Sequence, residues 1–140
     1  MVKKRKVKKK RAGKKIPKPL NFKGVLKLAD VLTAISGWFL IVVSAISLIF
    51  SNSIILNAAA LGFELGRANL YMILAAWVIL ALLTFMVNRM IKVYFRKNQM
   101  WGLLIIGLLM SLSVYISPVI VLVPAALVII SALIYLSKVK

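Results

Sequence analysis

The stretch VLTAISGWFLIVVSAISLIF, residues 31–50, decides the fold of this chain. It carries no charged side chain over a length close to the roughly 20 residues that a helix needs to cross the hydrocarbon core of a bilayer. Because hydrocarbon offers no water, such a stretch must satisfy its own backbone N–H and C=O groups, which a helix does. The stretch therefore predicts a transmembrane helix.

Three more apolar segments follow along the chain. Ser117-Pro118 separates the last two, because a proline disfavours helical geometry in the preceding residue and suits the first position of a new helix, with Ser117 as its N-cap. Pro124 is expected to kink the last helix. We predict an all-α membrane protein with a domain at 21–140 that holds four transmembrane helices. The predicted spans are about 28–50, 69–88, 100–116 and 118–136.

The connection between the first two spans, Ser51 to Asn69, has apolar residues at helical spacing with polar residues between them. This pattern predicts a short helix that lies flat in the membrane interface. Glu64 and Arg67, three residues apart, are expected to pair on its polar face.

Charge is distributed unevenly over the 140 residues, which include 20 basic and only 2 acidic side chains. Thirteen of the basic residues lie within residues 1–27, and two lie near the C-terminus, at Lys138 and Lys140. Four more form an inner-face basic loop: Arg89, Lys92, Arg96 and Lys97. All of these fall on one side of the predicted spans, and Lys and Arg gather in cytoplasmic loops. We therefore expect a multi-pass protein of the cell membrane with both termini in the cytoplasm.

Residues 1–20 form a polybasic tail that is too polar to build a core, so we expect it to be disordered. We first interpret this tail as an anchor to anionic phospholipids of the cytoplasmic leaflet. Nucleic acid, for example ribosomal RNA, is a second partner, since Lys and Arg runs bind phosphates without sequence preference. KKRKV also matches a nuclear-import signal, and an acidic protein is the remaining alternative. The contact residues are Lys3, Lys4, Arg5, Lys6, Lys8, Lys9, Lys10, Arg11, Lys14 and Lys15.

The side chains needed for catalysis and for metal binding are scarce. The chain has no Cys and no His, and its two acids, Asp30 and Glu64, fall on opposite sides of the predicted spans. A carboxylate pair for acid–base chemistry must lie within several ångströms. We therefore expect neither an enzyme nor a cofactor or metal site.

Asp30 is the one candidate for ion coupling. The chain resembles the small multidrug resistance family in length and in number of spans, and that family relies on a carboxylate within its first helix. Here Asp30 comes before the span, so we interpret it first as a helix-start residue, favoured by the helix dipole and by Lys27. A role in ion coupling is the alternative.

FMVNR, from Phe85 to Arg89, resembles the Phe-x-x-Asn-Arg that ends a helix in GtrA-like proteins, a family of four-span proteins implicated in moving lipid-linked sugars. The resemblance covers five residues, the Asn expected before that Phe is Thr84 here, and we assign no family from it. Gly107 and Ser111 have the small-xxx-small spacing that lets helices approach closely.

These observations favour a non-catalytic accessory or assembly subunit of a larger membrane complex, because a pump or an enzyme needs polar groups inside the membrane and this sequence has few. A subunit of a small oligomeric transporter or channel is the alternative. A membrane tether for RNA or ribosomes is the third hypothesis.

Overall fold

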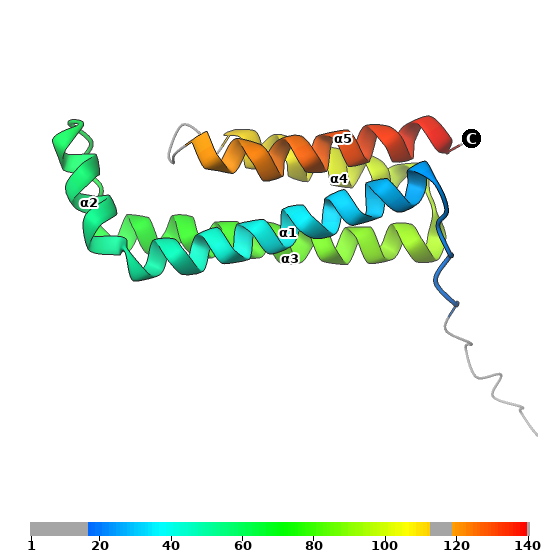
Figure 1. Ribbon diagram of the computed structural model, residues 1–140, viewed down its shortest axis with the longest axis horizontal. Coiled ribbons are helices and arrows are strands. Elements are labelled where there is room, and N and C mark those ends of the chain that lie inside the picture. The colour runs from blue at the N-terminus through cyan, green and yellow to red at the C-terminus, as the bar shows by residue number, and fades with distance from the viewer. Residues whose placement is uncertain (1–16, 113–118, 140) are drawn as a thin grey trace, which may run out of the picture.

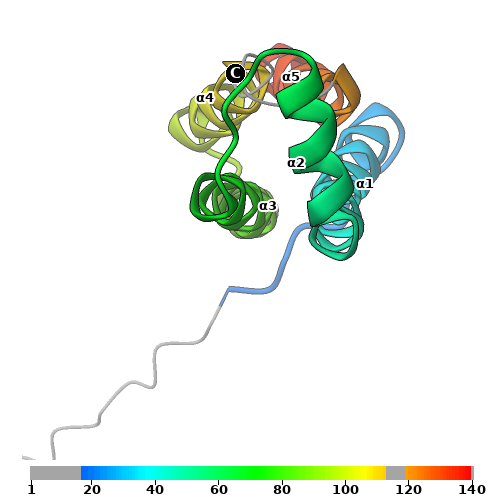
Figure 2. The same ribbon diagram turned by 90° about the vertical axis from the view of Figure 1, so that its left-hand side faces the viewer.

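The computed structural model describes residues 17–112 and 119–139, and within these it is all α-helical, with no strand. Four long helices lie side by side as a bundle, and a short helix, α2, crosses one end of it (Figures 1 and 2). A 3-10 turn, Val119–Val121, leads into the last helix. The α-helices are α1 Val25–Ile49, α2 Ser51–Ala60, α3 Arg67–Tyr94, α4 Lys97–Leu112 and α5 Leu122–Lys138.

Two glycines allow the closest approaches between helices. A Cβ placed on Gly37 of α1 would lie 2.6 Å from the ring of Phe85 on α3. A Cβ on Gly107 of α4 would lie 2.7 Å from Ile129 Cγ1 on α5 and 3.3 Å from the Ile129 backbone nitrogen. The close approach predicted at Gly107 is therefore confirmed, and it joins α4 to α5. The packing between α3 and α4 is less extensive than that of α4 on α5 or of α1 on α3 and α5.

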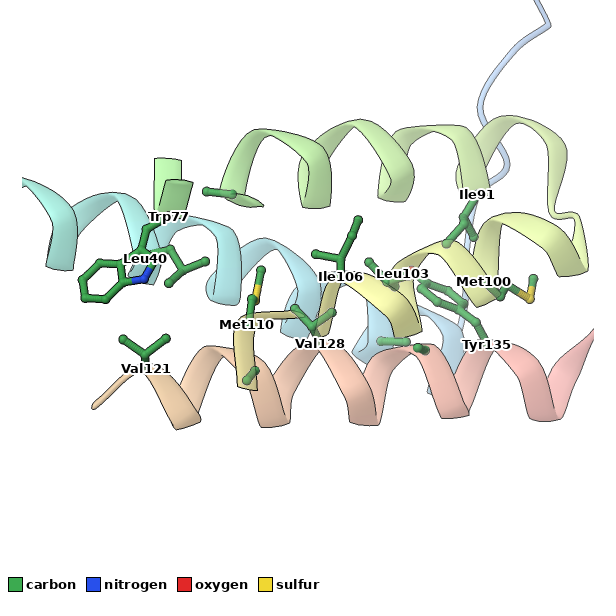
Figure 3. Close-up of a cluster of buried hydrophobic side chains, with 14 of the residues drawn as sticks. Leu40, Trp77, Ile91, Met100, Leu103, Ile106, Met110, Val121, Val128 and Tyr135 are labelled. Atoms are coloured by element: carbon green, nitrogen blue, oxygen red, sulfur yellow. The ribbon is translucent and has the colours of Figure 1, made fainter. Parts of the chain in front are cut away.

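Apolar side chains fill the centre of the bundle and also cover its outside. Leu40, Met110 and Val128 are fully buried in the core (Figure 3). Large side chains such as Ile79 and Leu133 are exposed on the outer surface. Within the described residues, α1 and α3 are long and apolar enough to cross a membrane, and α5 is a shorter apolar helix.

The helices begin and end at somewhat different residues from those predicted. α1 begins before residue 28, and α3 continues beyond residue 88 to Tyr94. Ser117 and Pro118 lie outside the described residues, but the helix predicted to begin at Pro118 begins at Leu122. Pro124 is thus in the first turn of α5, where its missing N–H would have had no helical partner and no kink is required.

The segment from Ser51 to Asn69, between the first two predicted spans, is partly as predicted. α2 is a short helix with no buried residue, but it ends at Ala60. The predicted Glu64–Arg67 pair is wrong, because the Arg67 guanidinium donates to Asn52 Oδ1 at 3.2 Å instead. Asn52 lies in the first turn of α2, so this bond ties the start of α2 to the start of α3.

Candidate functional site: a polar clamp at the basic end

Charge gathers at one end of the bundle, which we call the basic end. Here α1 begins, α3 ends, α4 begins and α5 ends, on the right in Figure 1. Eight of the nine described Lys and Arg residues lie at this end, and Arg67 lies at the other, beside α2. Asp30 is the acid of the basic end, so its partners decide how that charge is used.

Asp30 lies inside α1 and does not begin it. Gly24 occupies the N-cap position, with a φ of 59°, and the helix starts at Val25. The interpretation of Asp30 as a helix-start residue is therefore wrong. Gly24 adopts positive φ at little cost because it lacks a Cβ, so α1 starts early and carries Asp30 into its second turn, beside α3.

Both oxygens of the Asp30 carboxylate are bound by side chains of α3. Asn88 Nδ2 donates to Asp30 Oδ1 at 2.7 Å. Lys92 Nζ lies 2.7 Å from Asp30 Oδ2. Asn88 and Lys92 are four residues apart and so project from the same face of α3, one turn apart. Lys27, which was expected to favour Asp30 from the same helix, is not its partner, and the ion pair instead joins two helices.

Tyr135 extends this arrangement to a third helix. Its hydroxyl, from α5, donates to Asn88 Oδ1 at 3.0 Å. The Asn88 amide thus donates on one side and accepts on the other, and both Asn88 and Tyr135 are buried. We call Asp30, Asn88, Lys92 and Tyr135 the polar clamp, because together they link α1, α3 and α5.

The clamp combines strong hydrogen bonds with a partly solvated ion pair. A hydrogen bond to a charged group contributes about 1.5–3 kcal/mol. The ion pair contributes less, since the side chains of Lys92 and Asp30 remain 34% and 21% exposed and solvent screens them. Removing one partner costs more than the pair contributes, because the other charge is left partly buried without a counter-charge.

The segment before α1 packs against the clamp. The Leu20 backbone N–H donates to the Lys92 carbonyl at 2.7 Å. The Phe22 ring centroid lies 5.8 Å from that of Tyr135 and 5.7 Å from that of Phe95. Phe95 ends α3 in the left-handed conformation, with a φ of 46°. This reversal brings Phe95 against Phe22 in the segment that enters α1, and Phe22 also packs on Tyr135 of the clamp.

Buried hydroxyls elsewhere in the bundle serve packing. Thr33, Ser44, Thr84 and Ser131 each donate to the carbonyl four residues earlier in their own helix. Ser36 donates to the Pro124 carbonyl at 2.8 Å and joins α1 to α5. Ser36 therefore contributes to a contact between helices, and the other four hydroxyls bond within their own helices.

The structure divides the predicted basic loop into two parts. Lys92 belongs to the clamp, whereas the side chains of Arg89, Arg96 and Lys97 are exposed at the basic end. The Arg96 guanidinium lies over the Tyr94 ring, with Cζ 5.6 Å from the centroid. The ten predicted contact residues of the tail, Lys3 to Lys15, lie outside the described residues.

Asn88 and Tyr135 are the clamp residues that sequence reasoning missed. Asn88 is the one carboxamide between Asn69 and Asn98, and it stands one helical turn before Lys92. An amide and a cation on one helix face, together with one acid on the same side of the predicted spans, could have indicated this contact. Nothing in the sequence marks Tyr135 beyond its place near the end of the last span.

Comparison of the chain with protein-family models, with curated proteins and with solved structures finds no match.

Proposed function

We propose that this chain is a four-span protein of the cell membrane with its basic end in the cytoplasm, and that it serves as a non-catalytic accessory or assembly subunit. The distribution of charge supports the spans. α1 after Asp30, α3 between Arg67 and Arg89, and α5 before Lys138 carry no charged side chain. The described part of α4, Lys97–Leu112, carries no charged side chain after Lys97.

The polar clamp is the observation that supports the accessory role. Asp30 and Lys92 bind each other, and Asn88 and Tyr135 satisfy the remaining groups across three helices. Ionisable groups used in this way hold the bundle in one arrangement. The core beyond them is apolar at Leu40, Met110 and Val128. This arrangement suits a rigid helical unit whose apolar outer surface contacts lipid and the helices of a larger partner.

The charge of the basic end supports attachment to the anionic cytoplasmic leaflet. Each basic residue near such a surface contributes about 1 kcal/mol. The net charge is +18, and most of it belongs to this end and to the tail. The proposed partners are therefore anionic phospholipids, bound electrostatically, and a larger membrane complex, bound through the helices.

A transporter subunit is the second candidate, and Asp30 is the observation that favours it. An ionisable side chain within a span is a common mark of an ion pathway. Asp30 retains some exposure, and its counter-charge, Lys92, is on a different helix. In this function, breaking and re-forming the ion pair would accompany transport in a homo-oligomer.

One double substitution separates the two functions. Asp30→Asn/Lys92→Met removes both charges of the ion pair and keeps an oxygen that accepts from Asn88 Nδ2, so we expect it to change stability little. We would purify the tagged full chain and this variant in a gentle detergent, measure the mass of each complex, and identify and quantify the protein and RNA in it.

An accessory subunit should form a stoichiometric complex with a larger membrane protein, and the double variant should retain it. A homo-oligomer without another protein would contradict the accessory role and favour a transporter subunit. Loss of transport in the double variant, which lacks the ion pair, would strengthen that conclusion. RNA that leaves as salt rises would identify the chain as a nucleic-acid tether instead.

A further inference from the structure

Seven of the eight described basic side chains at the basic end have no acidic partner, and three of them lie where α3 ends and α4 begins. Lys92 forms an ion pair with Asp30, and no other ion pair is present among the described residues. Arg89, Arg96 and Lys97 are all exposed. Unpaired cations that gather at one end of an apolar bundle favour an anionic ligand at the level where the helices end.

The turn between α3 and α4 holds two of these cations close together. The left-handed Phe95 reverses the chain directly after α3, and Arg96 and Lys97 follow it. Lys97 begins α4, whose first backbone N–H groups add partial positive charge at the same place. Two cations and a helix start therefore point to a single negative group.

Aromatic rings border the same turn. Tyr94 and Trp101 are 50% and 49% exposed. The Arg96 guanidinium already lies 5.6 Å from the centre of the Tyr94 ring, which limits the positions it can adopt. Lys97 and Trp101 are four residues apart on α4 and so share a face. Exposed Tyr and Trp rings prefer the headgroup level of a bilayer.

We infer that Tyr94, Arg96, Lys97 and Trp101, which we call the turn site, bind the phosphate of an anionic phospholipid headgroup independently of the polybasic tail. Charge complementarity selects an anion, and the flanking surface selects a lipid. Met90 of α3 and Ile105 of α4 continue from the turn as exposed apolar side chains along which acyl chains can lie. The inference rests on the proposed membrane location and adds a defined site to it.

The test uses full-length chains in which the tail is neutralised, with each of its ten Lys and Arg residues between Lys3 and Lys15 replaced by Gln. This protein would be placed in nanodiscs of phosphatidylcholine with an equal amount of phosphatidylglycerol. Native mass spectrometry would then count the lipids that stay bound. The test variant adds Arg96→Gln/Lys97→Gln. The control adds Lys23→Gln/Lys27→Gln, which removes the same charge from the start of α1 at the same end.

The turn site predicts that the tail-neutral protein still prefers phosphatidylglycerol. Diffuse attraction to the leaflet gives a loss of about fivefold for each charge removed. The loss should exceed this when Arg96 and Lys97 are changed, and should not exceed it in the control. Equal losses in both variants would overturn the inference, since diffuse charge would then explain binding. Displacement of the lipid by a short single-stranded RNA at the same salt would also overturn it and assign the turn to nucleic acid.

The same experiment separates this inference from the proposed attachment. If the native tail confers a preference for phosphatidylglycerol and the tail-neutral protein has none, the turn site is refuted while the tail anchor stands. If the wild-type chain shows no preference either, the electrostatic attachment in the proposed function fails as well.

Discussion

Asp30 of α1 and Lys92 of α3 form an interhelical ion pair, with Oδ2 and Nζ 2.7 Å apart. The same Lys92 accepts a hydrogen bond from Leu20 through its backbone carbonyl, also at 2.7 Å. One residue of α3 therefore holds both the second turn of α1 and the segment that precedes it.

Breaking the ion pair on one side should destabilise the bundle more than removing it entirely. Lys92→Met leaves the Asp30 carboxylate partly buried without its counter-charge, and we expect a loss of about 1–3 kcal/mol. The double variant Asp30→Asn/Lys92→Met should recover most of this loss, because it removes both charges and keeps an oxygen that accepts from Asn88 Nδ2. Thermal unfolding in detergent, followed by circular dichroism, measures both. A double variant less stable than Lys92→Met would show that the charges themselves stabilise the bundle.

Asn88 should be the most sensitive polar position of the clamp. Asn88→Ala removes the bonds to Asp30 and to Tyr135 together, and we expect a loss of about 2–4 kcal/mol. Tyr135→Phe removes only one of these bonds and should cost about 1 kcal/mol. Thr84→Val is the control, because the Thr84 hydroxyl bonds only within α3. Equal effects at Asn88 and Thr84 would rule out a clamp that joins helices.

Gly107 and Gly102, on the same helix, should respond in opposite directions to alanine. At Gly107 the new Cβ would meet Ile129, including its backbone nitrogen at 3.3 Å, so α4 and α5 would have to separate. At Gly102 the Cβ would meet no atom within 4 Å, and alanine should stabilise the helix by about 0.5–1 kcal/mol. Melting temperatures of the two variants check this. A stabilising Gly107→Ala would contradict the close α4–α5 contact.

Phe22 should protect the clamp from water. Its ring contacts Tyr135 and Phe95, so Phe22→Ala removes a cover and loosens the segment that carries the Leu20 bond. Hydrogen exchange of the Leu20 amide should become faster, while amides in the middle of α1 should keep their rates. Leu28→Ala, at an exposed position of α1, provides the control. Unchanged exchange at Leu20 would mean that the segment is held by its backbone bond alone.

Long uncharged apolar runs were sufficient to predict the helices of the bundle but not the contacts within it. Uncharged runs predict helices near α1, α3, α4 and α5, and Gly107 predicted a close helix contact that the structure confirms. The start of α1 was missed because it depends on Gly24, whose positive φ is a property of local backbone geometry. The early start turns Asp30 from a terminal residue into an interior one.

The clamp could be predicted only in part, because its partners are distant in sequence. Asn88 and Lys92 share a helix face by spacing alone. Which residue of α1 faces Lys92, Asp30 or Lys27, depends on how α1 is rotated against α3. Glu64 and Arg67 show the opposite case. Helical spacing suggested that they pair, but α2 ends at Ala60, so neither residue lies on it and Arg67 reaches Asn52.

The proposed function depends on a bundle that spans the membrane with its basic end in the cytoplasm. Because the chain has no cysteine, a single introduced cysteine can report on which side of the membrane it lies. Asn57→Cys, at an exposed position of α2, and Asn98→Cys, at an exposed position of α4 at the basic end, would be treated separately with a membrane-impermeant maleimide. We predict that the cysteine at position 57 reacts in intact cells, and that the one at position 98 reacts only after the cells are opened. Reaction at position 98 in intact cells, or equal reaction at both positions, would contradict a membrane protein with its basic end in the cytoplasm.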